Sequence, residues 1–287
     1  MNEKDIKILC MYYRDILTDT NMFPFYNIQC GAETAGFNLG MQGDNSGDNI
    51  SGENRFWSEI TGLYWAWKNV DETKYIGLCS YRRFFNLKNS RKPIVKARKS
   101  DAHNVLNNID YSCLDEIFSK SDVILPVEYT YAWSIRRVCS MNYKDDDFTL
   151  LEDYIKNNCP EYYDSYIDVM FHGNKLVGHN MFIFKWAEFQ EYCDWVFDIL
   201  LSLKDLINPE DYPIAQIRVF GYMHEVLLPV YIHKRKLSIY RSQILWVDDS
   251  DNDIRFNNIS YQLLSNITYN SMRLLGKNYP HLLNRKK

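Results

Sequence analysis

Residues 75–85 read Y-I-G-L-C-S-Y-R-R-F-F, a short apolar run that ends on two adjacent arginines among aromatic side chains. The run is typical of a buried β-strand, and Arg82 and Arg83 directly follow it. Guanidinium groups bind phosphate and carboxylate through paired hydrogen bonds and are costly to bury without a partner. Two explanations stay open at this point, an anionic ligand or an internal salt bridge to an Asp or Glu side chain.

The size and charge of the chain limit its class. It has 287 residues, of which 46% are hydrophobic and 24% charged, enough for one large domain with a substantial core. The formal net charge of −4 and the pI of about 5.9 argue against a nucleic-acid partner, because phosphate contacts need a basic footprint. Aromatic residues make up 15% of the chain, which is typical of proteins that stack against sugars or bases.

The cysteines and the N-terminus indicate a cytoplasmic protein. Seven cysteines are scattered singly without a C-x-x-C pair, as expected of reduced core thiols. The N-terminus lacks the apolar stretch of a signal peptide, and no stretch approaches the roughly 20 apolar residues of a membrane span. The sequence contains no P-loop, G-x-G-x-x-G or G-x-S-x-G, so the common ATPase, dinucleotide-binding and hydrolase classes are disfavoured.

The order of elements predicts an α/β fold, because β-prone runs alternate with helical stretches. The runs lie at residues 6–11, 25–30, 75–79, 122–126 and 181–184. The strongest helical pattern covers residues 54–69, and it places Trp65 on the exposed side, opposite the apolar face of that helix. The tail from residue 239 is mixed and polar. We therefore expect a main domain at residues 1–238 and a packing appendage at 239–287.

Two polar segments interrupt this pattern. Residues 34–54 are rich in Gly, Asn, Asp and Ser, which predicts a loop over a site or a solvated linker. Residues 88–99 are basic and contain no acidic residue. Their cations are Lys88, Arg91, Lys92, Lys96, Arg98 and Lys99. Such a run is usually a solvated loop, and the alternative is a patch that meets anionic lipid or a phosphorylated acceptor.

Polar residues that could carry chemistry are distributed over predicted strand ends and loops, where open α/β sheets bind ligands. They are Asp44, Asp48, Asn49, Arg82, Arg83, His179, Asn180, Arg218 and Glu225. Arg82 or Arg83 can neutralise a phosphate leaving group, and Glu225 can take a proton from an attacking hydroxyl.

Metal-binding patterns are weak. The His residues that are close in sequence lack i, i+4 spacing, and no Cys/His cluster exists, so we expect no protein metal site. A D-x-D occurs at residues 145–147, but in a hydrophilic stretch rather than at the end of a buried strand. Divalent Mn²⁺ or Mg²⁺ as a cofactor is left open.

Six stretches carry a family resemblance. They are G-D-N-I-S (47–51), S-E-I-T-G-L-Y-W-A-W-K-N (58–69), Y-I-G-L-C-S-Y-R-R-F-F (75–85), H-N-M-F-I-F (179–184), E-Y-C-D-W-V-F-D-I-L (191–200) and R-V-F-G-Y-M-H-E (218–225). In this order they resemble a bacterial family catalogued as domain of unknown function 4422. That family is found in capsular and exopolysaccharide synthesis and is regarded as glycosyltransferases. The resemblance covers about residues 5–235.

The resemblance implies a nucleotide-sugar-dependent transferase with a GT-A-like fold, a Rossmann-type mixed sheet flanked by helices, with a helical C-terminal appendage. On that analogy, residues 75–79 occupy the place where many such enzymes carry a metal-binding D-x-D. Here Ser80, Tyr81, Arg82 and Arg83 follow the strand, so cations of the chain can stabilise the departing diphosphate. The sequence departs from the family pattern at Ser80, where the family usually has His, and at Val226, where the family usually has Arg. Neither change removes the arginine pair or Glu225.

These observations together predict a cytoplasmic hexosyltransferase that uses a UDP-linked sugar and a lipid-linked capsular, exopolysaccharide or O-antigen acceptor. The expected roles are Arg82, Arg83 and Tyr81 at the diphosphate, Asp48 and Asn49 at the nucleotide or donor sugar, His179, Asn180, Trp65 and Arg218 at the substrate, and Glu225 as general base. The segment from Lys88 to Lys99 would contact the inner membrane surface. Two alternatives stay open, a non-catalytic glycan- or nucleotide-binding module of the same fold and an RNA-binding protein that uses the basic segment.

Overall fold

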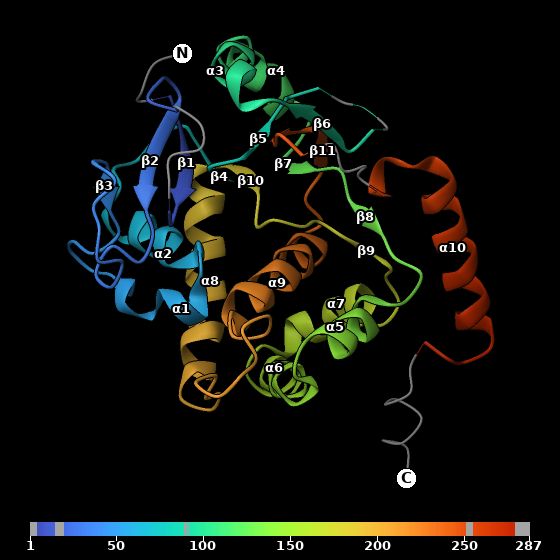
Figure 1. The fold of residues 1–287 in the computed structure, drawn as a ribbon. Helices are drawn as coiled ribbons and strands as arrows, with labels where there is room; N and C mark the ends of the chain where they lie inside the picture. Colours follow the sequence, from blue (N-terminus) through green and yellow to red (C-terminus); the bar gives the residue numbers. More distant parts are fainter. Residues whose placement is uncertain (1–4, 15–19, 89, 91, 251–254, 279–287) are drawn as a thin grey trace. The chain divides into compact units, whose positions relative to one another are not determined.

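A mixed β-sheet with helices on both faces organises the first part of the molecule (Figure 1). A computed structural model describes residues 5–14, 20–88, 90, 92–250 and 255–278. These residues divide into two units. The first is formed by described parts of Met1–Val127, His179–Asp198 and Leu237–Asn252, and the second by described parts of Glu128–Gly178, Ile199–Lys236 and Asp253–Lys287.

The sheet of the first unit has a central row in the order β11-β7-β10-β4-β1-β2-β3, and β5, β12 and β6 extend it from β4. The strands are β1 (Ile6–Tyr12), β2 (Phe25–Gln29), β3 (Gln42–Gly43), β4 (Tyr75–Ser80), β5 (Arg83–Phe85), β6 (Ile94–Ala97), β7 (Val123–Pro126), β10 (Phe182–Lys185), β11 (Ile239–Ser242) and β12 (Ile244–Val247). Within the central row β10 alone runs antiparallel to its neighbours. The carboxyl ends of β1, β2, β4 and β7 therefore share one edge with the amino end of β10.

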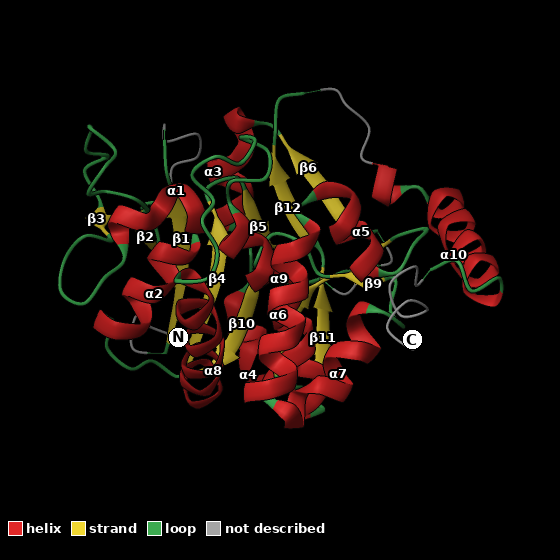
Figure 2. Cartoon of the chain, turned by 90° about the horizontal axis from the view of Figure 1, so that it is seen from below, coloured by secondary structure: helices red, strands yellow, loops and turns green. Residues whose placement is uncertain are grey.

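The central strands are apolar because helices cover both of their faces, as expected for a largely parallel sheet. On one face, α2 (Ile60–Asn69) approaches β1 so closely that a Cβ on Gly62 would come within 2.6 Å of the Met11 sulfur. The same face of β10 packs on α8 (Trp186–Lys204), and Figure 2 shows both helices in front of the sheet. On the other face, Phe118 of α4 (Leu114–Phe118) stacks on β4.

The helix predicted over residues 54–69 is interrupted. It forms two pieces, α1 (Asn54–Trp57) and α2, because Ser58 adopts a non-helical backbone conformation with φ 57° and ψ −136°. The remaining helical segments of the first unit are η1 (Ser51–Glu53), α3 (Lys99–Asn107) and η2 (Tyr111–Cys113).

The prediction that Trp65 is exposed was wrong. Its side chain is 4% exposed, its ring stacks on Tyr26 with centroids 6.4 Å apart, and its Nε1 donates to Ser46 Oγ at 3.0 Å. The periodicity of one helix does not reveal that the polar loop folds over the back of that helix. The substrate role predicted for Trp65 rested on its exposure and loses that basis.

The second unit is mainly helical, with one antiparallel two-stranded ribbon. Its elements are β8 (Tyr129–Thr130), α5 (Ile135–Asn142), α6 (Asp145–Asn158), α7 (Pro160–Met170), β9 (Lys175–Leu176), the end of α8, α9 (Val219–Arg235), η3 (Arg255–Asn257) and α10 (Ile259–Leu274). Helices α5, α6, α7 and α9 contact one another, and α10 packs beside β8 (Figure 1).

The expected fold class is confirmed, a mixed α/β sheet flanked by helices, and α10 supplies the helical part predicted near the C-terminus. The tail is nevertheless not an appendage throughout, because β11 and β12 are strands of the sheet. Runs of four residues are too short for periodicity to distinguish strand from loop. Residues 251–254 and 279–287 of the predicted appendage lie outside the described residues.

Candidate functional site

The strand edge at which the sequence predicts ligand binding lies in the first unit, where β1 and β4 end beside the start of β10. Met11 of β1 pairs with Ser80, the last residue of β4, and Phe182 of β10 pairs with Leu78 of β4. The residues that follow β1 and β4 therefore lie close to those that precede β10. Open α/β sheets bind their ligands at this carboxyl edge.

A two-residue turn places the arginine pair at this edge. Ser80 pairs with Arg83, so Tyr81 and Arg82 form the turn between β4 and β5. The Arg82 guanidinium lies over the Tyr81 ring, 5.6 Å from its centroid. The Arg83 guanidinium lies over the Trp246 ring at 4.5 Å, because β12 pairs antiparallel with β5 and sets Trp246 opposite Arg83. Both cations are thus held by aromatic rings.

Several buried polar atoms at this turn have no hydrogen-bond partner among the described residues. They are Ser80 Oγ, Arg82 Nε and Trp246 Nε1. Within the same residues, the Arg82 guanidinium also has no carboxylate within 4.0 Å. Buried polar groups are normally hydrogen-bonded, so a cluster of unpartnered donors beside a cation favours an anionic ligand over the internal salt bridge.

A third guanidinium joins the site from the end of β1. Arg14 donates to the Tyr81 hydroxyl at 3.4 Å, and Tyr81 donates to Tyr13 at 3.3 Å. Burial raises the pKa of Tyr81, but the hydrogen bonds to Tyr13 and Arg14 and the charge of Arg82 outweigh burial, so its pKa is lowered overall. A lowered tyrosine pKa indicates a positive local potential. Tyr13 and Arg14 were not predicted, although Tyr-Tyr-Arg at the end of β1 (residues 12–14) is similar to Tyr-Arg-Arg after β4 (residues 81–83).

His179 and Asn180 enter the same edge in an unusual backbone conformation. Both are left-handed, with φ 73° and 52°, which costs free energy in residues other than Gly and is concentrated at functional sites. The His179 ring meets Trp246 edge-on at 5.8 Å. Burial, and then the charges of Arg83 and Arg82, hold the pKa of His179 well below its usual value, so the imidazole is neutral at pH 7.

Asn180 has a structural contact within this edge. Its side chain is buried, and Nδ2 donates to Glu59 Oε1 at 3.0 Å. The structure therefore brings His179 to the arginine pair and ties Asn180 to the connection between α1 and α2. The sugar-binding roles of both residues stay predictions.

The polar loop before α1 is held by one buried carboxylate. Asp44 accepts hydrogen bonds from Gly31 N at 2.9 Å, Ala32 N at 3.0 Å, Ser51 Oγ at 2.5 Å and Thr61 Oγ1 at 2.6 Å. Four donors satisfy a carboxylate, so Asp44 orders the loop and α2.

Asp48 and Asn49 lie on the outer part of this loop. Asp48 accepts from the Tyr64 hydroxyl at 3.1 Å, and Asn49 donates to Gly47 O at 3.0 Å. Burial, and next the hydrogen bond to Asp48, raise the pKa of Tyr64 to about 12. These contacts order the loop, and the donor-binding roles of Asp48 and Asn49 stay predictions.

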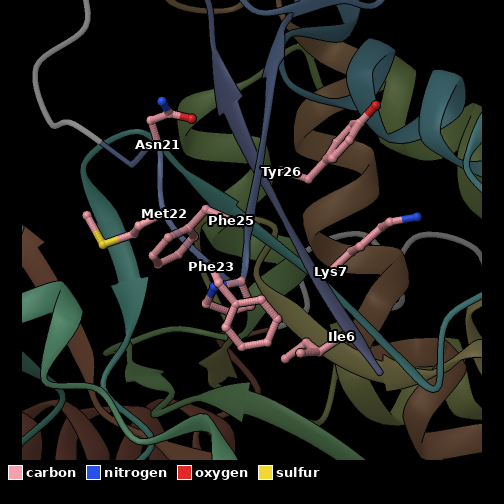
Figure 3. Close-up of a pocket in the computed structure, with 8 residues that line it drawn as sticks. Ile6, Lys7, Asn21, Met22, Phe23, Phe25 and Tyr26 are labelled. Carbon is pink, nitrogen blue, oxygen red and sulfur yellow. The ribbon is translucent and has the colours of Figure 1, made fainter. Parts of the chain in front are cut away.

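Two cavities flank β1 and β2. One, of about 420 Å³, is lined by Tyr12, Thr20, Asn27 and the loop segment 39–42, and Tyr12 lies 5.9 Å from the Tyr81 ring. This cavity adjoins the arginine site. The other, of about 330 Å³, lies where β1 and β2 begin, and Figure 3 shows Ile6, Phe23 and Phe25 gathered there. It lies at the edge of the sheet opposite the arginines.

Two predicted site residues belong to the second unit. Arg218 is exposed at the start of α9, with its guanidinium 5.7 Å from the Tyr222 ring centroid. Glu225 is half-buried on α9. Burial, and next the negative charge of Glu225, raise the pKa of Tyr143. The roles of Arg218 and Glu225 stay predictions.

The structure also describes the weaker candidates. Asp145 and Asp147 of the D-x-D lie in the first turn of α6, where Asp145 pairs with Arg136 and Asp147 accepts from Tyr212 at 2.9 Å. Where the structure describes the chain, no group of three or more His, Cys, Asp or Glu could hold a metal ion.

In the basic segment 88–99, Lys96 and Lys99 lie 3.7 Å and 3.5 Å from Asp248 and Asp249, and Arg91 is outside the described residues. No helix among the described residues is both long and apolar enough to span a membrane.

The sheet, its helices and this cationic edge define an α/β protein with a GT-A-like fold. A family described as "Domain of unknown function (DUF4422)" matches residues 7–236, and the chain belongs to this family, as the sequence blocks predicted. Trp246 lies outside the matched residues.

Among solved structures, the chain is similar to "WbbM bifunctional glycosyltransferase apo structure", with a TM-score of 0.73 and 23% identity. The match covers 85% of this chain and 46% of that one, so the chain spans about half the length of that protein. At this identity the likeness shows a shared fold. A search of curated proteins finds no match.

Proposed function

We propose that this chain is a glycosyltransferase that moves a hexose from a UDP-linked sugar to a hydroxyl of a lipid-linked capsular, exopolysaccharide or O-antigen intermediate. The observation that carries the proposal is the arginine site at the end of β4, with its buried donors that lack partners among the described residues. It lies at the ligand-binding edge of a fold shared with a protein described as a glycosyltransferase. The free cysteines agree with a cytoplasmic location.

The chemistry of the site suits a diphosphate leaving group. Negative charge develops on the departing phosphate oxygen as the bond to the sugar breaks, and donors already aimed at that charge lower the barrier. Arg82 and Arg83 supply cationic hydrogen-bond donors for this negative charge, and Arg14 adds to the positive potential. We assign the nucleotide to the cavity beside Tyr12, with Asp48 and Asn49 on the loop that also supplies residues 39–42 to that cavity.

The acceptor side of the reaction needs a base. We assign this role to Glu225, which would take the proton of the attacking hydroxyl, while neutral His179, with Asn180 and Arg218, would bind sugar hydroxyls. Because the arginines provide the charge stabilisation in this proposal, turnover is expected to persist in EDTA. Loss of turnover in EDTA with recovery in Mn²⁺ or Mg²⁺ would transfer that role to a metal ion.

Calorimetry with UDP and assays of donor hydrolysis or transfer with a panel of UDP-hexoses test the proposal. An Arg82→Ala, Arg83→Ala double variant should lose UDP binding, whereas Arg98→Ala, which removes an exposed cation of the same unit, should not. A Glu225→Gln variant should keep UDP binding and lose turnover by about 10²–10⁴-fold. A folded double arginine variant with full activity would refute the assignment.

A non-catalytic binding module of the same fold is the second candidate. The observation in its favour is that the described residues offer no cluster of carboxylates for a metal ion. Such a module would bind UDP or glycan without hydrolysing or transferring any donor, so the same two measurements separate the candidates.

A further inference from the structure

The last helix of the second unit exposes apolar side chains to solvent. Five large apolar residues of α10 are each at least 60% exposed, namely Ile259, Leu263, Leu264, Ile267 and Leu274. At about 100° per residue, all but Leu264 fall within an arc of about 80°. We call these four residues the apolar stripe. It has the form of the apolar face of an amphipathic helix, although no described residue of the unit covers it.

The face of α10 that packs on its own unit is different in character. Its buried residues are Ser265 and Tyr269, on the side of the helix opposite the apolar stripe. Tyr269 donates to His172 O at 2.6 Å, and Asn174 Nδ2 donates to Asn266 Oδ1 at 3.1 Å. Helices usually dock through their apolar face, and this one docks through polar contacts instead. The apolar stripe is therefore available to contact a surface outside the unit.

The sequence that contains the apolar stripe carries only positive charge. From residue 254 to residue 287 the sequence contains six Lys or Arg and no Asp or Glu, although the formal net charge of the whole chain is −4. Arg273 and Lys277 belong to this set, and both are exposed. Arg273 flanks the stripe beside Leu274, where its long side chain can reach an interface while the apolar residues insert.

We propose that α10 is an interfacial helix that seats the protein on a membrane leaflet containing anionic phospholipid. An apolar face bordered by cations matches such a surface, with the apolar residues among the acyl chains and the cations at the headgroups. The charge disfavours a second copy of the chain as the occupant, because two basic helices would face each other. The proposal does not rest on the transfer reaction, although a lipid-linked acceptor would lie in the same surface.

This surface is distinct from the basic segment 88–99 that the sequence suggested for membrane contact. In that segment, Asp248 and Asp249 already neutralise part of the charge through Lys96 and Lys99. Around the apolar stripe, Arg273 and Lys277 have no acidic residue near them in the sequence. Contact with anionic lipid is therefore assigned to α10.

Flotation of the full chain with lipid vesicles tests this assignment. The protein should bind vesicles that contain phosphatidylglycerol more tightly than vesicles of phosphatidylcholine alone. A Leu263→Gln, Ile267→Gln double variant should lower the apparent lipid affinity about tenfold or more, because two apolar side chains no longer insert. A matched control, Leu206→Gln with Ile214→Gln, removes two side chains of the same unit that are also at least 60% exposed, and it should bind as the native protein does.

Three results would overturn the proposal. They are failure of the native protein to bind vesicles with phosphatidylglycerol, equal binding by the native protein and the stripe variant, and a native dimer that the stripe variant converts to a monomer. The last result would assign the stripe to a second copy. Circular dichroism confirms that each variant is folded. UDP binding should be the same in all of them, so failure here is separate from failure of the donor site.

Discussion

Two Arg-Arg pairs in this protein occupy contrasting environments. In the second unit, Arg136 is buried, and its terminal nitrogens bond to Asp145 Oδ1 at 2.5 Å and Thr149 Oγ1 at 3.2 Å. In the first unit, Arg82 has the Tyr81 ring beside it and no side-chain hydrogen bond within the described residues. Within the described residues, the Nε atoms of Arg82 and Arg136 are both buried without a hydrogen-bond partner. The two arginines therefore differ in the contacts of their terminal nitrogens.

The second members of the two pairs are alike. Arg83 lies 4.5 Å from the ring centroid of Trp246, and Arg137 lies 3.8 Å from that of Trp133. The first members therefore differ, because Arg136 has the carboxylate of Asp145 and Arg82 has no carboxylate within 4.0 Å among the described residues. The comparison shows that the dipeptide itself is no signal of function. Its position decides, because one pair follows a strand at the ligand-binding edge and the other lies within helix α5.

The largest expected effect separates the first members of the pairs. Arg82→Ala should lower turnover about 10²–10³-fold and leave the melting temperature nearly unchanged, because it removes a donor to developing charge and breaks no internal ion pair. Arg136→Ala should keep turnover and lower the free energy of unfolding by about 1–3 kcal/mol, because it removes a buried cation that is hydrogen-bonded to the half-buried Asp145 and Thr149. Steady-state kinetics and urea unfolding of both variants measure these effects. The comparison fails if Arg82→Ala unfolds the protein or Arg136→Ala abolishes transfer.

The sequence predicted the strands that position Arg82 and Arg83, for a physical reason. Largely apolar runs identified β1, β4, β7 and β10, since strands covered on both faces are mostly apolar, and a β-prone run at residues 25–30 identified β2. A cation directly after such a run is exceptional, which is why the prediction of an anion site at Arg82 and Arg83 was possible. His179 was chosen because it directly precedes a predicted strand, and its sugar-binding role stays a prediction.

The rest of the site depends on contacts between distant parts of the chain. Trp246 reaches Arg83 only because β12 pairs with β5, and nothing local in residues 244–247 shows this register. The break at Ser58 and the burial of Trp65 also follow from tertiary packing, which a helical period does not include. The roles of Asp48, Asn49, Arg218 and Glu225 stay predictions, which only a bound ligand or kinetics can test.

A smaller effect should separate the two tryptophans. Trp246→Leu removes the ring beneath Arg83 and a buried N–H, and it should weaken UDP binding about tenfold by releasing the guanidinium. Trp246→Phe keeps a ring and should recover part of the affinity. Trp133→Leu, the matched change beneath Arg137, should leave UDP binding unchanged. Equal losses from Trp246→Leu and Trp133→Leu in calorimetry would show that the effect is general destabilisation.

The smallest expected effect concerns two neutral histidines, His179, which is half-buried, and His224, which is buried. Burial lowers the pKa of His224, on α9, to about 3, whereas the pKa of His179 is lowered by burial and also by Arg83 and Arg82. A bound diphosphate would offset those two charges, so the pKa of His179 should rise in the complex and that of His224 should not.

A group whose pKa is higher in the complex takes up a proton on binding, so its contribution to affinity grows as the pH falls. The UDP affinity of the native protein relative to His179→Gln should therefore rise between pH 7 and pH 5.5, by at most about twofold because burial still lowers the pKa of His179 in the complex. The ratio to His224→Gln should stay constant, and calorimetry at four pH values would show it. Taking ratios at each pH removes the protonation of UDP itself. A flat ratio for His179→Gln would place the diphosphate away from Arg82 and Arg83. A different anion would then have to be sought for Arg82 and Arg83.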